Sequence, residues 1–217
     1  MSQTDNRCRL VLIVPDIADA TERARIVGDA LKGGDVASVI VPQYGLDDQA
    51  FQKHAEALVP LIQEAGAAAL VAGDTRVAGR VRADGLHVEG NHEVMTEAME
   101  KFSPKLIVGG GNAADRHHAL EIGEAKPDYI FFGKLNGDIK PEAHGKNVAL
   151  GEWWSSMIEI PCIVMGGADP ASALAVAESG AEFVALHRAV FEVPKRAAAV
   201  IAEVNALLDE KAPRFGA

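Results

Sequence analysis

Cysteine is scarce in this sequence. Only two occur, Cys8 and Cys162, and no Cys-x-x-Cys or Cys/His metal-binding spacing accompanies them. Each lies inside a short apolar run, where a thiol usually behaves as a small core residue. A disulfide framework and a zinc site are therefore not expected, and both thiols are predicted to pack in the core.

Long apolar stretches are missing as well. No run approaches the ~20 residues that a membrane-spanning helix needs. Residues 1–10 also lack the apolar segment of a secretory signal peptide. These absences predict a soluble, cytoplasmic protein with no membrane partner.

Basic residues are outnumbered by acidic ones. The chain has 21 Lys and Arg against 31 Asp and Glu, which gives a formal net charge of −10. Nucleic acid would be repelled on average, so no nucleic-acid partner is expected. A small anion could still bind in a locally positive pocket.

What the sequence does contain is a series of eight short apolar runs. Their continuous rather than alternating hydrophobicity is typical of strands buried on both faces, as in a parallel sheet covered by helices. The segments between them have helical periodicity, and Asp169-Pro170 has the pattern of a helix start. The runs cover residues 9–14, 36–41, 67–72, 85–88, 105–109, 128–133, 162–166 and 182–186.

Eight strands alternating with helices favour a closed barrel. Open sheets in chains of this length more often have five or six strands. We therefore predict one (β/α)8 TIM barrel, an α/β fold, over residues 1–217. The longest connections follow the second run (residues 42–48) and the sixth (residues 134–154). Loops after strands form the active-site face of a barrel, so function is expected there.

The clearest local signal for function lies near the C-terminal end. The seventh run ends in Gly166-Gly167, and the eighth ends beside His187 and Arg188. Glycine has no Cβ, so backbone N–H groups at such a turn can approach an anion closely, and arginine can donate two parallel hydrogen bonds to phosphate. This pattern predicts a phosphate site. The alternative is a turn used only for tight packing, with Arg188 in solvent.

Four stretches resemble motifs of thiamine phosphate synthases and their thiazole tautomerase relatives. They are GDTRV (73–77), ADGLHVEG (83–90), DYIFFGKL (128–135) and IVMGGADPASALAVAESGAEFVALHRAVF (163–191). The resemblance implies an enzyme that joins a pyrimidine pyrophosphate to a thiazole phosphate and releases pyrophosphate. It also implies that Gly166, Gly167 and the start of the last helix bind the thiazole phosphate.

The resemblance further implies a Mg²⁺ ion and a cation beside the pyrophosphate. Mg²⁺ prefers oxygen ligands and often bridges phosphates, so one or two carboxylates suffice. Asp74, or Thr75 in its place, lies where the family has an Asn-Asp pair. Lys140-Pro141 resembles the family's Thr-Lys-Pro loop, whose lysine holds pyrophosphate; the alternative is that Lys140 is an exposed loop lysine. Asp74 is thus a candidate catalytic and metal-binding residue, and Lys140 a candidate catalytic residue.

Several family positions are altered. The strand-two motif with two cations is replaced by SVIVPQYG (38–45), which leaves Gln43 and Tyr44 as the polar groups. The second metal carboxylate has no direct match, and Glu89 or Glu93 would substitute for it. A serine-rich turn is replaced by GGGNAADRHH (109–118).

The remaining candidates each have a structural alternative. Gly110, within the triple glycine, and Asn112, a potential helix cap, would form a second anion site, a flat surface for an aromatic ring, or a close packing contact. His87 is either a satisfied core residue or a substrate contact, and Lys134 is a further basic candidate.

Three functional hypotheses follow. The first is a thiamine phosphate synthase with rearranged pyrophosphate contacts. The second is a non-catalytic or altered-function barrel that binds a small phosphorylated metabolite. The third is a lyase or isomerase that uses Lys134 or Lys140 with Asp74. The pair Trp153 and Trp154 would also suit a contact between copies of the chain in a homo-oligomer.

Overall fold

Eight parallel strands close into a barrel. The computed structural model describes residues 6–111 and 113–216. Each strand pairs with the next along the chain, and β8 pairs with β1. The strands are β1 (Arg9–Ile13), β2 (Ser38–Pro42), β3 (Ala68–Ala72), β4 (Gly85–Glu89), β5 (Ile107–Gly111), β6 (Tyr129–Phe132), β7 (Cys162–Met165) and β8 (Phe183–Leu186). The predicted TIM barrel is confirmed, and each predicted strand agrees with an observed one to within two residues.

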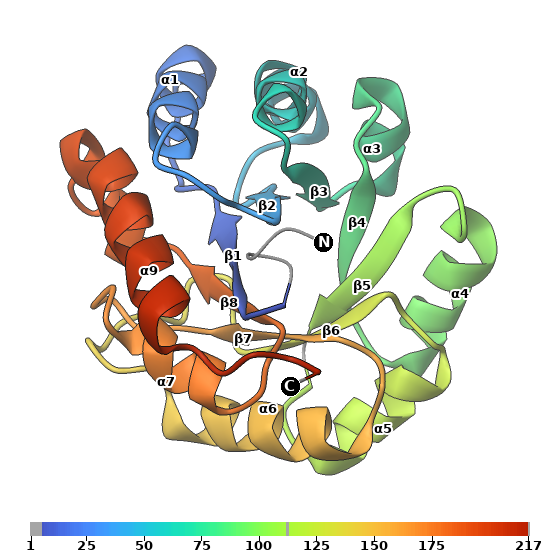
Figure 1. The fold of residues 1–217 in the computed structure, drawn as a ribbon. Helices are drawn as coiled ribbons and strands as arrows, with labels where there is room; N and C mark the ends of the chain where they lie inside the picture. Colours follow the sequence, from blue (N-terminus) through green and yellow to red (C-terminus); the bar gives the residue numbers. More distant parts are fainter. Residues whose placement is uncertain (1–5, 112, 217) are drawn as a thin grey trace.

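Helices follow the strands and surround the barrel (Figure 1). The helices are α1 (Ala20–Leu31), α2 (Asp48–Glu64), α3 (Thr75–Val81), α4 (His92–Phe102), α5 (Arg116–Glu124), α6 (Gly145–Met157), α7 (Ser172–Glu178), α8 (Arg188–Phe191) and α9 (Ala197–Lys211), with a short 3₁₀ turn η1 (Pro194–Arg196) before α9. Helix α9 packs against α1 and α7, which completes the outer ring. None of the helices described is both long and apolar enough to cross a membrane.

The barrel interior is filled by side chains that point inward from the strands. Tyr129 and Phe131 of β6 are large members of this layer, and two glycines of β5 face them. A Cβ added to Gly109 would lie 2.3 Å from the Tyr129 ring, and one added to Gly111 would lie 3.4 Å from Phe131. The Tyr129 ring therefore requires glycine at position 109, whereas a Cβ at Gly111 would make an ordinary van der Waals contact with Phe131.

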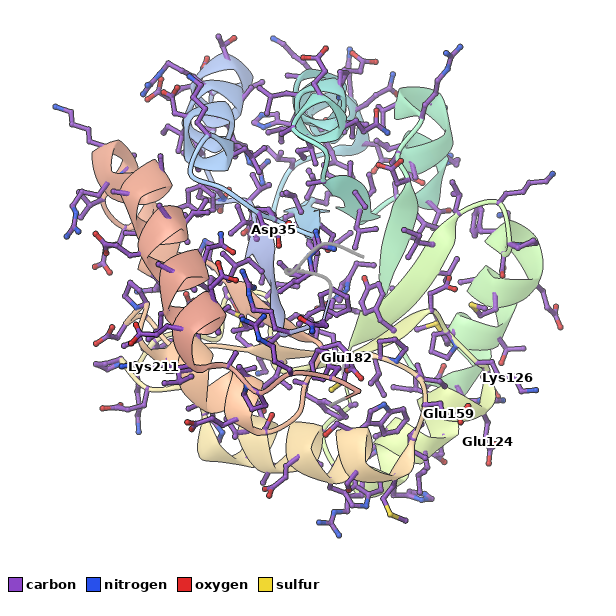
Figure 2. All side chains as sticks on the ribbon, in the orientation of Figure 1. Asp35, Glu124, Lys126, Glu159, Glu182 and Lys211 are labelled. Carbon is purple, nitrogen blue, oxygen red and sulfur yellow. The ribbon has the colours of Figure 1, made fainter. Side chains whose placement is uncertain are left out.

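Carboxylates join the strands at the N-terminal end of the barrel. Asp84, Asp128 and Glu182, each just before or at the start of a strand, accept hydrogen bonds of 2.7–2.9 Å from backbone N–H groups of the preceding strand. Asp35 accepts two further bonds, of 2.6 and 2.9 Å, from Arg9. Figure 2 labels Asp35 and Glu182 close to the barrel strands. These hydrogen bonds stabilise the fold, which is the usual role of polar residues at the N-terminal end of a barrel.

Three residues discussed from the sequence belong to the core. Cys8 and Cys162 are buried and free, and burial raises the pKa of both thiols. Trp154 is buried, whereas its neighbour Trp153 is half-buried, with the Arg116 guanidinium 5.0 Å from its ring. The thiols are thus packing residues, as predicted, and Trp154 is not available for a contact between copies.

Gly109→Ala should lower the free energy of unfolding by about 1–3 kcal/mol, because the new methyl group would overlap the Tyr129 ring. Gly79→Ala is a matched control. A Cβ at Gly79, within α3, meets nothing within 4 Å, and alanine favours helix, so stability should be kept or increased. Urea unfolding followed by circular dichroism measures both. Equal stability of Gly109→Ala and wild type would contradict close packing at this point.

Candidate active site

A cavity of about 630 Å³ opens at the C-terminal ends of β2, β3, β4 and β6. Its lining includes five residues predicted from the sequence, namely Gln43, Tyr44, His87, Glu89 and Lys134. They converge because the C-terminal ends of parallel strands meet on one face of a barrel. The cavity therefore lies on the face where barrel enzymes place their sites.

Tyr44 forms one wall of this cavity in a conformation unusual for a side chain larger than glycine. Its φ is +50°, in the left-handed region. The hydroxyl donates a hydrogen bond of 2.6 Å to the carbonyl of Val14, and the Arg23 guanidinium lies 5.3 Å from the ring centroid. Burial raises the Tyr44 pKa to about 12, so the hydroxyl stays protonated. The hydrogen bond to Val14 and the Arg23 guanidinium thus hold the Tyr44 ring in place.

Arg23 is the residue beneath this wall, and the sequence reasoning missed it. Its guanidinium is buried, donates to the Pro42 carbonyl at 3.2 Å and lies 3.2 Å from Nδ1 of His54. Burial lowers its pKa. A cation therefore lies below the β2–α2 loop, although strand two has none. The available signal was an arginine on the apolar face of a helix, three residues before Ile26.

Gln43 connects the loops after β2 and β3. Its Oε1 accepts a hydrogen bond of 2.9 Å from the backbone N–H of Asp74, and its Nε2 donates to the Leu46 carbonyl at 3.1 Å. A Cβ on Gly73 would lie 2.5 Å from that same Oε1. Gln43 thus fixes the relative position of two loops that border the cavity.

His87 lines the cavity, and one of its two ring nitrogens is buried without a hydrogen-bond partner. Its Nδ1 lies 2.8 Å from the Tyr129 hydroxyl, and its Nε2 is buried with no hydrogen-bond partner. Burial lowers the His87 pKa to about 3 and raises that of Tyr129, so the imidazole is neutral and the phenol protonated. The donor of this hydrogen bond depends on the imidazole tautomer. In the tautomer in which the phenol donates to Nδ1, the ring proton resides on Nε2.

The two carboxylates predicted to hold Mg²⁺ have different surroundings. Asp74 caps α3 and accepts hydrogen bonds from the backbone N–H of Arg76 at 3.0 Å and from its Nε at 3.0 and 3.1 Å. The Arg76 side chain holds the pKa of Asp74 below its usual range. Glu89 is exposed and lines the cavity. The described residues include no group of three or more His, Cys, Asp or Glu that could hold a metal, so an ion would depend on substrate oxygens as well.

Of the two glycines after β7, Gly166 lies against β8 and Ser172, whereas Gly167 lies against the β6–α6 loop (residues 133–144). A Cβ on Gly167 would lie 2.1 Å from the Pro141 carbonyl oxygen. The backbone N–H groups of Ala168 and Asp169 donate to the carbonyls of Lys140 and Pro141 at 2.8 and 3.0 Å. The glycine does permit a close approach, as predicted, but the approaching group is this loop.

The turn before α7 differs in detail from the sequence expectation. The predicted helix start at Asp169-Pro170 is a turn, and α7 begins at Ser172. The Asp169 carboxylate accepts a hydrogen bond of 2.9 Å from the backbone N–H of Ala171, and Ser172 Oγ accepts one of 2.8 Å from Gly167 N–H. The helix therefore begins two residues later than expected, and Asp169 and Ser172 accept hydrogen bonds from the turn that precedes it.

The end of β8 contacts the same loop through Asp138. The Asp138 carboxylate is buried and accepts a short hydrogen bond from the backbone N–H of Arg188. It also accepts from Nδ1 of His187 at 3.3 Å, and Nε of Arg188 lies 4.0 Å away. The Arg188 side chain is 49% exposed. Asp138 was missed because a lone acidic residue in a long loop carries no sequence signal.

The other predicted residues lie apart from the cavity lining. Lys140 is exposed on the loop, and its carbonyl is the group that contacts Ala168. A Cβ on Gly110 would lie 1.8 Å from the Val88 carbonyl and 3.0 Å from Met95, so this glycine serves strand and helix packing. Asn112 lies outside the described residues.

The fold and the cavity define a (β/α)8 barrel with its site at the C-terminal ends of the strands. The family described as thiamine monophosphate synthase matches residues 10–190. The chain belongs to this family.

Relatives over most of the chain agree with this assignment. Thiamine-phosphate synthase of Rhodospirillum centenum is 32% identical over 203 residues, covering 93% of this chain and 98% of that protein. The synthase of Hyphomonas neptunium is 30% identical, with 97% and 98% covered. Thiamine phosphate pyrophosphorylase from Pyrococcus furiosus has a similar structure, with a TM-score of 0.77 at 21% identity, covering 95% and 98%. At that identity the structural likeness supports the fold.

His87 should make stability depend on pH. Its folded-state pKa of about 3 lies below the value of 6.5 expected when it is exposed. As the pH falls from about 6.5 towards 3, the unfolded chain takes up a proton that the folded chain does not, so stability is lost, by at most about 1.4 kcal/mol per pH unit. His87→Gln should show a shallower loss in urea unfolding between about pH 6 and pH 4. Parallel pH profiles for the two proteins would contradict a neutral His87.

Proposed function

We propose that this protein joins a pyrimidine pyrophosphate to a thiazole phosphate and releases pyrophosphate, giving thiamine phosphate. The observation that carries the proposal is the 630 Å³ cavity on the active-site face of a chain in this family. Its walls offer an aromatic ring, a neutral donor and a cation, which are the groups that an aminopyrimidine with an anionic leaving group would need.

The pyrimidine would occupy the part of the cavity between Tyr44 and His87. The Nε2–H of His87 would donate to a ring nitrogen, which would satisfy a donor that has no partner in the protein. Because the imidazole is neutral, it would not add positive charge beside a reacting centre that itself becomes positive. Gln43 would keep the β2–α2 and β3–α3 loops in place around the ring.

The pyrophosphate would lie towards Lys134 and Lys140 of the β6–α6 loop. Breaking its bond to the pyrimidine leaves both bonding electrons on pyrophosphate, and the two ammonium groups would stabilise that negative charge. The pyrimidine, now electron-deficient, is captured by the thiazole nitrogen. A cavity that excludes water protects it from capture by water in the meantime.

Mg²⁺ is part of this proposal. When bound, it would neutralise charge on the leaving pyrophosphate, and Glu89 in the cavity wall would be its protein ligand. Asp74 would become a second ligand only by exchanging its Arg76 contacts for the ion. Gly166, Gly167, His187 and Arg188 would hold the thiazole phosphate.

A second candidate function is a barrel that binds a small phosphorylated metabolite without turnover. Two observations favour it. Strand two carries no cation, and the β6–α6 loop already occupies the hydrogen-bond donors at the ends of β7 and β8. We further propose a cytoplasmic protein that binds no nucleic acid, since its net charge is −10.

Incubation of the purified protein with both thiamine precursors and Mg²⁺ should yield thiamine phosphate. Lys134→Ala should lower kcat/KM by about a hundredfold, because it removes a contact to the leaving group. Lys211→Ala, at the end of α9, is the charge-matched control and should leave kcat/KM unchanged. Chromatography of the product measures the activity of the wild type and of both variants. No product at high protein concentration, combined with calorimetric binding of thiazole phosphate, would favour the binding function instead.

A further inference from the structure

We propose that Asp138 determines the specificity of the phosphate end of this site by acting as an internal competitor for phosphate. The carboxylate occupies the donors at the end of β8, so an anion binds there only by displacing it. The inference rests on the proposed function for its choice of ligand, but the contacts that carry it are independent of any reaction.

The first observation is the position of a buried charge. The Asp138 side chain is 0% exposed although it belongs to a loop, and its contacts are the Arg188 backbone N–H, Nδ1 of His187 and, at 4.0 Å, Nε of Arg188. A backbone N–H, an imidazole and a guanidinium are also the donors that bind a phosphate group. Asp138 thus uses the groups that a phosphate would use.

The second observation is that the same loop accepts hydrogen bonds from the turn between β7 and α7. The N–H groups of Ala168 and Asp169 donate to the carbonyls of Lys140 and Pro141, and the Gly167 N–H donates to Ser172. The space that a Cβ of Gly167 would fill contains the Pro141 carbonyl oxygen. Together the two observations leave a phosphate without a free backbone N–H at Gly167, Ala168, Asp169 or Arg188 while the loop is in place, so only the half-exposed Arg188 guanidinium stays accessible.

The loop also borders the cavity. Lys134, Leu135 and Asn136 line it, and the negative charge of Asp138 contributes to raising the Tyr44 pKa across it. A ligand that fills the cavity therefore contacts the loop segment that leads to Asp138. The binding energy of such a ligand would offset the free-energy cost of displacing the Asp138 carboxylate. Free phosphate or sulfate makes no such second contact with the loop.

Apart from the packing of Leu135 and Ala143 against the core, the loop has few contacts that resist this movement. Ile139 is 73% exposed, and the side chains of Lys134 and Lys140 are exposed on either side of Asp138. Segments with exposed side chains and little regular structure open at low free-energy cost. Asp138 and the two carbonyls are therefore the main attachment, and removing the negative charge should weaken it.

Binding of inorganic phosphate tests the proposal without any turnover. We expect Asp138→Asn, which keeps the shape of the side chain, and Asp138→Ala to bind phosphate at least about tenfold more tightly than wild type, measured by calorimetry. Ile139→Ser, in the same loop, is the control and should match wild type. Arg188→Ala added to Asp138→Asn should abolish the gain, which would place the phosphate at this end of the barrel.

Trypsin cleavage after Lys134 gives a second measurement. Release of the loop in Asp138→Asn should raise the cleavage rate several-fold relative to Ile139→Ser, as followed by mass spectrometry, while thermal unfolding confirms that both variants are folded. Equal phosphate affinity in wild type and both Asp138 variants, or a gain that survives Arg188→Ala, would overturn the proposal. Failure to form thiamine phosphate would overturn only the proposed reaction, since neither measurement here depends on it.

Discussion

The interior of an eight-stranded barrel has to be filled by the side chains of its own strands, and in this protein two aromatic rings of β6 do much of that filling. Tyr129 fits only because β5 carries Gly109 beside it. The same packing brings the Tyr129 hydroxyl to Nδ1 of His87. One volume constraint therefore requires glycine at position 109 and fixes the position of His87.

Buried charges shape the other side of the site. Arg23, from α1, lies below Tyr44, and Asp138, from the β6–α6 loop, lies against the end of β8. Neither is an exposed ligand contact: Asp138 is bonded to the end of β8, and both terminal nitrogens of Arg23 are bonded within the protein, although its Nε is buried without a partner. Removing such a group would leave its buried partners unsatisfied, which is why charges of this kind fix loop positions more firmly than surface ion pairs do.

Several residues of the predicted site have a physical explanation in this chain alone. Gly167 leaves room for the Pro141 carbonyl, and His87 is held by the packing of Tyr129. The strand-two cations are absent, while a buried cation from another element lies in the same region. Charge near the site is thus supplied by different elements in this chain.

The sequence predicted local geometry best where the backbone controls the residue. Gly167 was expected to allow a close approach, and it does, but the approaching group is the Pro141 carbonyl rather than an anion. A glycine pattern indicates that space is needed and carries no information on what fills it. Gln43, Tyr44, His87, Glu89 and Lys134 were brought together as expected, since strand ends of a barrel share one face.

The sequence by itself determined the eight strands, their alternation with helices and the closed barrel, because burial on both faces imposes continuous apolar runs. It also determined that both cysteines are packing residues. Only the tertiary structure decided the roles of Arg23 and Asp138 and the state of His87. Those depend on contacts between residues far apart in the chain, and on desolvation, which no local pattern of residues records.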